Sequence, residues 1–314
     1  RKKSRGRGNK VSSPPMRSLH KNRVFAASGR GLRPWPLLCL VALLALPLGG
    51  TAAPEVGLPT VASTDLCADL LLLQLADPGQ IVSVSSAAID PELSPFATQA
   101  KRYPTNSGSV EELLLLRPAI ALVYQGWTGR GHKDLLAARG VQIEPLPYPS
   151  GWDHTRQTVL ETSALLGRVA FGAKLIAQTE RRMQALADRT PPLSVLYLRP
   201  NGGTAGANTY VDDLLHRLGL RNLAADSGMR GWGRFPLERL VANPPDLFLL
   251  GYFDQAQPRS KSAFARHPLF QQVLERIPAI AVPAGNWGCG GIELVSVAED
   301  IVAQIDDLSN RADR

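Results

Sequence analysis

Short apolar runs alternate with segments of helical periodicity along most of the chain. In the first half, strand-like runs occupy Thr60–Thr64, Ile81–Ser85, the end of Glu111–Tyr124 and Val141–Leu146, and helical patterns occupy Cys67–Asp77 and His132–Gly140. In the second half, strand-like runs occupy Leu193–Arg199, the end of Glu238–Phe253 and Ile277–Pro283, with a Gly-rich turn at Asn201–Asn208 and a helix at Tyr210–Leu220. This alternation predicts an α/β fold with mainly parallel sheets.

One spacing occurs in both halves. Glu111 precedes Pro118 by seven positions and an apolar run ending at Tyr124, and Glu238 precedes Pro245 by the same seven positions and a run ending at Tyr252. The repeated spacing predicts two similar α/β lobes.

Two helical segments separate these halves, Asp153–Gly167 and Ala170–Arg189. The second has apolar residues at helical spacing, and about 20 residues at 1.5 Å each make a rod of roughly 30 Å. We therefore expect an N-terminal lobe at residues 53–152, connecting helices at 153–190 and a C-terminal lobe at 191–314. A long connecting helix limits hinge closure between lobes.

Composition first suggests a nucleic-acid-binding protein, because the 314 residues carry a net charge of +8. The distribution of the charge argues against that class. Residues 1–52 hold 11 Lys and Arg and no acid, which leaves 24 basic against 27 acidic residues in the remainder. A slightly acidic body has no general affinity for phosphate backbones.

The basic leader has the three parts of a secretory signal peptide. After the basic segment, Leu37–Leu46 is continuously apolar, and the small residues Gly50–Ala53 offer a cleavage site after Ala52. The alternative is an uncleaved anchor, although the apolar run is about half the length of a spanning helix. Met16 is a possible start, with residues 1–15 as an upstream extension. We expect a periplasmic protein in an oxidising compartment.

The leader, the two lobes and the connecting helix resemble the helical-backbone (class III) periplasmic binding proteins of ABC importers for iron–siderophore complexes, haem and cobalamin. The resemblance covers roughly residues 58–308, through segments that include TVASTDLCADLLLLQLADPGQIVSVS, SVEELLLLRPAIALV, GWGRFPLERLVANPPDLFLL and NWGCGGIELVSVAEDIV. It departs from the family at Ala119, where an Asp is frequent; the second lobe keeps Asp246.

The resemblance implies that the protein captures a ligand and catalyses no reaction. A cleft between the lobes would hold a metal chelate, and Glu111 and Glu238 would dock onto Arg residues of a permease that works with an ATPase. The alternative for each Glu is a first-turn acid that stabilises its own helix. A ferric siderophore is the first expectation, followed by cobalamin and haem. We expect a monomer with no resident cofactor and no nucleic-acid partner.

Ligand contacts are expected just after strands, because ligands bind beyond the carboxyl ends of strands in open α/β sheets. The candidates are Cys67, Tyr103, Tyr124, Trp127, Trp152, Arg199, Trp232, Arg234, Tyr252 and Trp287. All four Trp residues after the leader fall in these loops, which favours an aromatic cleft. The alternatives are Trp residues that plug the ends of the lobes and Arg residues exposed to solvent.

Cys67 and Cys289 are the only cysteines after the leader. They could form a disulfide, remain two separate buried thiols, or contact a metal. A disulfide requires Cα atoms within about 7 Å of each other.

Other functional classes find little support. The four His residues after the leader form no HxH or HxxxH pair, so a free-metal receptor is disfavoured. The chain has no GxSxG, HExxH or CxxC motif, which disfavours an exported hydrolase. An exported sensory or interaction module on the same fold remains an alternative.

Overall fold

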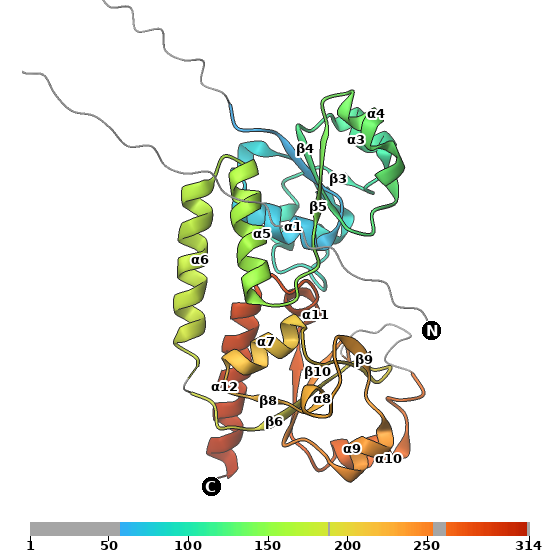
Figure 1. The fold of residues 1–314 in the computed structure, drawn as a ribbon, viewed down its shortest axis with the longest axis vertical. Coiled ribbons are helices and arrows are strands. Elements are labelled where there is room, and N and C mark those ends of the chain that lie inside the picture. Colours follow the sequence, from blue (N-terminus) through green and yellow to red (C-terminus); the bar gives the residue numbers. More distant parts are fainter. Residues whose placement is uncertain (1–56, 188, 254–261, 313–314) are drawn as a thin grey trace, which may run out of the picture. The chain divides into compact units, whose positions relative to one another are not determined.

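The computed structural model describes residues 57–187, 189–253 and 262–312 (Figure 1). The expected signal peptide at residues 1–52 lies outside these ranges. Among the helices within them, none combines the length and apolarity needed to cross a bilayer.

A five-stranded parallel sheet forms the centre of the first half, in the spatial order β3-β2-β1-β4-β5. Its strands are β1 (Val61–Ser63), β2 (Ile81–Ser85), β3 (Thr105–Asn106), β4 (Ile120–Tyr124) and β5 (Gln142–Leu146). Its helices are α1 (Leu66–Leu75), α2 (Ala97–Ala100), α3 (Val110–Leu116) and α4 (Lys133–Ala137), with single 3-10 turns η1 (Pro78–Gln80), η2 (Ser86–Ile89) and η3 (Thr128–His132). The first four residues of β4 are all buried, as expected for a parallel strand covered on both faces.

A four-stranded parallel sheet forms the centre of the second half, in the order β11-β10-β6-β8. The strands of this half are β6 (Ser194–Leu198), β7 (Gly203–Ala205), β8 (Arg221–Asn222), β9 (Trp232–Arg234), β10 (Leu247–Gly251) and β11 (Ala279–Val282). Its helices are α7 (Tyr210–Arg217), α8 (Leu223–Asp226), α9 (Leu237–Ala242), α10 (Pro268–Leu274), α11 (Ala284–Trp287) and α12 (Leu294–Ala312).

The two halves share one arrangement of strands. Four strands of the first sheet have the spatial order β2-β1-β4-β5, and the second sheet has the order β8-β6-β10-β11. In both, the first strand of the sheet along the chain lies between the second strand and the strand that follows the Glu-containing helix. In both, a short helix that begins one residue before the Glu leads into the second central strand, and a fully buried Leu follows the Glu by two positions. The predicted α/β class with two similar, mainly parallel halves is confirmed.

Two helices connect the halves, α5 (Trp152–Leu165) and α6 (Val169–Gln184). They lie side by side in Figure 1, and α5 contacts both α1 of the first half and α7 of the second. The backbone N–H of Trp152 donates to the Asp213 carboxylate on α7 at 2.9 Å. The long connecting helix α6 is shorter than the predicted segment 170–189, since it has 16 residues and a length of about 24 Å. The helix α5 also links the two halves, because it contacts an element of each.

The second half contains elements that the sequence pattern did not reveal. The expected Gly-rich turn at 201–208 includes β7, which pairs antiparallel with β9 about 30 residues later. Strands of three residues that contain a glycine carry too little alternation to be recognised. The sequence pattern also did not predict the bounds of α12, which has 19 residues and is the longest helix in the described chain.

A buried carboxylate joins the elements of the first half. Asp69 on α1 is fully buried, and it accepts hydrogen bonds from the Ser63 hydroxyl on β1 and from the backbone N–H and hydroxyl of Ser85 on β2. Burial raises the pKa of Asp69 from its usual 3.8 to about 6, although the hydrogen bonds oppose this rise.

We expect the Asp69→Asn variant to lose a pH-dependent part of the stability. Since the folded-state pKa exceeds the unfolded one, the stabilisation from the bound proton is complete below about pH 4 and is lost as the pH rises through about 6. A shift of roughly two units corresponds to about 3 kcal/mol. Urea unfolding at pH 4 and pH 7 measures this difference. Between these two pH values, the free energy of unfolding of the wild type should fall by more than that of Asp69→Asn. Equal falls in the two proteins would contradict the assignment.

Candidate functional site

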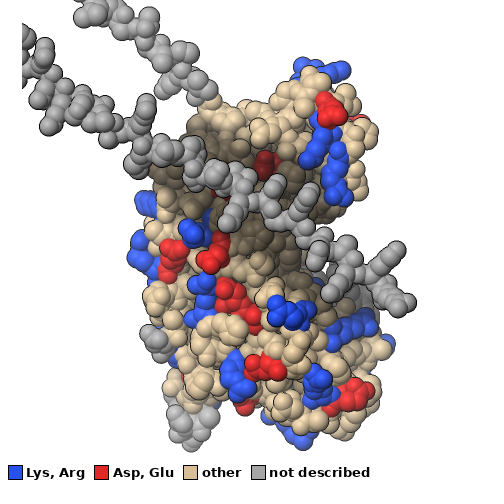
Figure 2. All heavy atoms as spheres, in the orientation of Figure 1, with Lys and Arg blue, Asp and Glu red and all other residues tan. Residues whose placement is uncertain are grey.

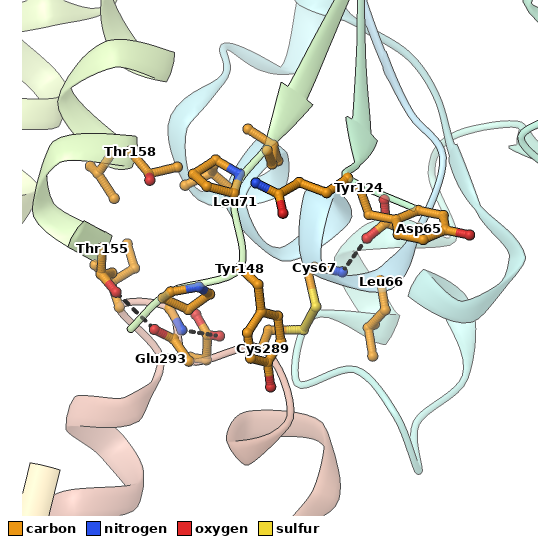
Figure 3. Close-up of a pocket in the computed structure, with 18 residues that line it drawn as sticks. Asp65, Leu66, Cys67, Leu71, Tyr124, Tyr148, Thr155, Thr158, Cys289 and Glu293 are labelled. Carbon is orange, nitrogen blue, oxygen red and sulfur yellow. Dashed lines mark hydrogen bonds between the residues drawn. A yellow bond between two sulfur atoms is a disulfide. The ribbon is translucent and has the colours of Figure 1, made fainter. Parts of the chain in front are cut away.

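A pocket of about 450 Å³ lies where the first half meets the second, and Figure 3 draws the 18 residues that line it. The first half contributes the start of α1, the ends of β4 and β5 with the loop after β5, and one face of α5. The second half contributes the five residues Cys289–Glu293 before α12. The pocket lies beyond the carboxyl ends of parallel strands and has the volume of a small-molecule site.

The lining of this pocket is mainly apolar and contains no basic residue. Its two charged groups are the carboxyls of Asp65 and Glu293. Asp65 caps α1 by accepting from the backbone N–H groups of Cys67 and Ala68 at 3.0 and 3.2 Å, and Glu293 accepts from the Gly291 N–H at 3.1 Å. Burial raises the pKa of both carboxyls. Such a lining suits an uncharged, apolar part of a ligand.

An aromatic wall adjoins the pocket at Tyr148. The Tyr148 ring, which lines the pocket, meets the Trp232 ring edge-on at a centroid distance of 6.4 Å. Trp232 also contacts Tyr210 at 5.5 Å and Tyr197 at 6.3 Å. Trp232 and Tyr148 are 39% and 47% exposed, so both rings have a face available to a ligand.

Arg199 lies in this wall without a carboxylate partner among the described residues. Its guanidinium carbon is 4.7 Å from the ring centroid of Trp232 and 5.1 Å from that of Tyr252, and its Nε donates to the Tyr197 hydroxyl at 3.0 Å. Burial raises the pKa of Tyr197 to about 12, so this phenol stays neutral and does not compensate the cation. A half-buried, oriented guanidinium without a counter-charge is suited to bind an anionic group.

Half of the ten predicted ligand residues lie at the pocket or the wall. Cys67 and Tyr124 line the pocket, and Arg199, Trp232 and Tyr252 form part of the wall. Their contact with a ligand stays a prediction.

The other five do not line the pocket, and two of them, Trp127 and Trp287, are buried where the sequence predicted rings lining an aromatic cleft. Trp127 and Trp287 are 3% and 0% exposed and pack in the cores of their halves. Trp287, the last residue of α11, contacts the rings of Tyr197 and Tyr210 of the wall from within the core. Trp127 Nε1 donates to the Gly108 carbonyl at 2.7 Å. The other three also stand apart from the pocket lining: Trp152 donates to Glu180, Tyr103 packs against the core of the first half, and Arg234 is exposed on β9.

Several residues of the pocket and the wall were not predicted from the sequence. Tyr210 lies inside a helix, Asp65 is an N-cap, and Gly290–Glu293 comes from the far end of the chain. Asp65 could have been found as the capping residue at the carboxyl end of β1. Nothing local in the sequence places the last segment against the first half.

Cys67 and Cys289 form a disulfide, with their Cα atoms 5.3 Å apart. Of the three states left open by the sequence, the structure has this one. The bond connects the first turn of α1 to the segment before α12, and both cysteines line the pocket. No group of three or more His, Cys, Asp or Glu residues in the described chain is arranged to hold a metal ion.

The sequence profile of the periplasmic binding proteins matches residues 61–280, which span both central sheets. The chain belongs to the periplasmic binding protein family. Class III members of this family serve ABC importers, binding a substrate without transforming it, and they work in the periplasm. No curated protein matches the chain in sequence.

Solved structures of other periplasmic binding proteins share the fold. The haem-binding protein RhuT from Roseiflexus sp. RS-1 is 24% identical, with a TM-score of 0.61 over 80% of this chain and 99% of that one. The haem-binding protein HutB of Vibrio cholerae is 18% identical, with a TM-score of 0.65 over 79% and 98%. The vitamin B12-binding protein BtuF of Vibrio cholerae is 14% identical, with a TM-score of 0.58 over 79% and 97%. At these identities the likeness establishes the fold and leaves the ligand open.

Proposed function

We propose that this periplasmic binding protein captures a metal tetrapyrrole, haem or a cobalamin, and delivers it to an ABC importer. The observation that carries the proposal is the pairing of an apolar pocket with a single uncompensated cation, Arg199, in the adjoining aromatic wall. The haem- and vitamin B12-binding proteins of the same fold support this ligand class.

The charges of the site favour a tetrapyrrole over a polyanionic siderophore. Haem has large apolar faces and its propionates as anionic groups. A cobalamin has neutral amides around its ring and a phosphate as its anionic group. The pocket offers apolar contact, and Arg199 offers one bidentate site for an acidic group. A ferric tricatecholate would bring several negative charges toward Asp65 and Glu293, where no basic residue lines the pocket.

We expect haemin or cyanocobalamin to quench the fluorescence of the purified mature protein at micromolar concentrations. A panel of ferric siderophores is titrated in parallel, and tighter binding of any siderophore would replace the tetrapyrrole proposal with the original siderophore expectation. The Trp232→Phe variant should lose most of the quenching, because Trp232 is exposed at the wall. Trp127→Phe, a change in the buried core, is the matched control and should keep it. Absence of binding across the panel would refute the proposal.

We expect Arg199→Ala to weaken binding of the tetrapyrrole about ten- to a hundred-fold, the loss of one charged hydrogen-bonding partner. Arg234→Ala is the matched control, since Arg234 is exposed on β9 within the same half. Its affinity should stay within about two-fold of the wild type. Equal effects of the two substitutions on the dissociation constant would show that Arg199 has no specific role.

Docking onto the permease is assigned in this proposal to Glu111 and Glu238. Each is the second residue of a short helix, α3 or α9, and each is exposed. Neither takes part in an ion pair among the described residues. The equivalent placement in the two halves fits a partner with two equivalent basic sites. We expect the receptor to act as a monomer, since one copy carries both docking acids.

We expect the double variant Glu111→Ala/Glu238→Ala to reduce uptake about ten-fold or more while its ligand affinity stays unchanged, since docking charges lie outside the pocket. The control is Glu92→Ala/Glu275→Ala, which removes two exposed acids outside α3 and α9. Uptake of labelled ligand and fluorescence titration measure the two properties separately. A matching loss of affinity would contradict a docking role.

A further inference from the structure

One wall of the pocket belongs to the second half of the chain. Cys289–Glu293, which we term the bridging segment, leads from α11 to α12, yet it faces residues of α1, the β5 loop and α5 (Figure 3). The pocket is therefore complete only while this segment stays against the first half.

Three kinds of contact hold the bridging segment in place. The disulfide attaches Cys289 to Cys67 on α1. The Thr155 hydroxyl on α5 donates to the Gly290 carbonyl at 2.9 Å in a buried bond, and the Gly151 carbonyl is a second, longer acceptor at 3.2 Å. Ile292 is 3% exposed and belongs to the hydrophobic core of the first half, where α1 and α5 also contribute.

The geometry at Gly290 shows how closely the segment is packed. Its φ is +66°, and a Cβ at this position would lie 2.7 Å from atoms of both Pro149 and Tyr210. Only glycine fits this conformation and this gap. The segment thus threads between the β5 loop of the first half and α7 of the second, and it has little room for a second arrangement.

A pocket wall that is already ordered in the free protein lowers the conformational entropy that is lost when the ligand binds. If the segment were free to leave the first half, the ligand would have to order it, and the complex would dissociate faster. A covalent link 222 residues apart in sequence excludes such excursions more completely than a hydrogen bond does.

We propose that the Cys67–Cys289 disulfide and Thr155 position the bridging segment as a pre-formed wall of the ligand pocket, and that ligand retention depends on this positioning. The inference rests on the proposed function of the pocket as the chelate site. It assigns to the disulfide a role in binding that is separate from its contribution to global stability.

The test compares the dissociation rate of haemin or cyanocobalamin, whichever binds the wild type, between the wild type and Cys67→Ala/Cys289→Ala. The double variant leaves no thiol that could ligate the metal. We expect dissociation about ten-fold faster with an association rate within about two-fold. Thr155→Val keeps the disulfide and should accelerate dissociation about three-fold. Thr179→Val is its matched control, because Thr179 is a buried threonine of α6 that donates to the Leu175 carbonyl in its own helix and does not line the pocket.

Amide hydrogen exchange of the ligand-free proteins separates the two proposals. In the cysteine double variant, exchange should rise at residues 289–293 while the central strands stay protected. If the wild type binds no chelate, the proposed function fails and the exchange pattern alone decides the positioning role. Unchanged exchange in this segment, or dissociation rates equal to those of the wild type, would overturn the inference.

Discussion

The packing of the bridging segment into the first half is the constraint on which the site depends. Two parallel sheets alone would present two open ends facing each other. Because Ile292 is buried in the core of the first half and Cys289 is bonded to α1, the second half is fixed to the first beside the pocket. Together with α5, which contacts α1 and α7, this leaves the pocket with one permanent wall. The sequence predicted that a connecting helix limits closure of the two halves, and the disulfide would be a second, covalent restraint on the same movement.

The distribution of charge follows from the same arrangement. A pocket closed on one side excludes water from Asp65 and Glu293, and their raised pKa values show the cost of ionising them there. Burial also opposes the charge of Arg199, but its hydrogen bond to Tyr197 and the tyrosine rings around it outweigh this effect and raise its pKa. The site therefore has an apolar pocket and, beside it, one guanidinium group. It suits ligands that have an apolar body and an anionic group at one edge.

Much of the fold was predictable because it is encoded locally. Apolar runs such as Val195–Leu198 form fully buried strands, and the repeated spacing at Glu111 and Glu238 reflects a real equivalence of α3 and α9. The short pair β7 and β9 was missed because glycine-containing strands of three residues carry no periodic signal, and their pairing is set by tertiary contact.

The site was predicted less well, for a physical reason that the Trp residues illustrate. The end of a parallel sheet must be covered whether or not it binds a ligand, so a large aromatic residue after a strand has two possible uses. Trp127, just after β4, is buried and donates to the Gly108 carbonyl. Trp232, the first residue of β9, contacts the rings of Tyr148, Tyr210 and Tyr197 and stays 39% exposed. The choice is made by neighbours that are distant in sequence. The sequence placed all four Trp residues in loops, whereas three of them belong to elements, α5, β9 and α11, and only their packing partners decide between a buried ring and one open to a ligand.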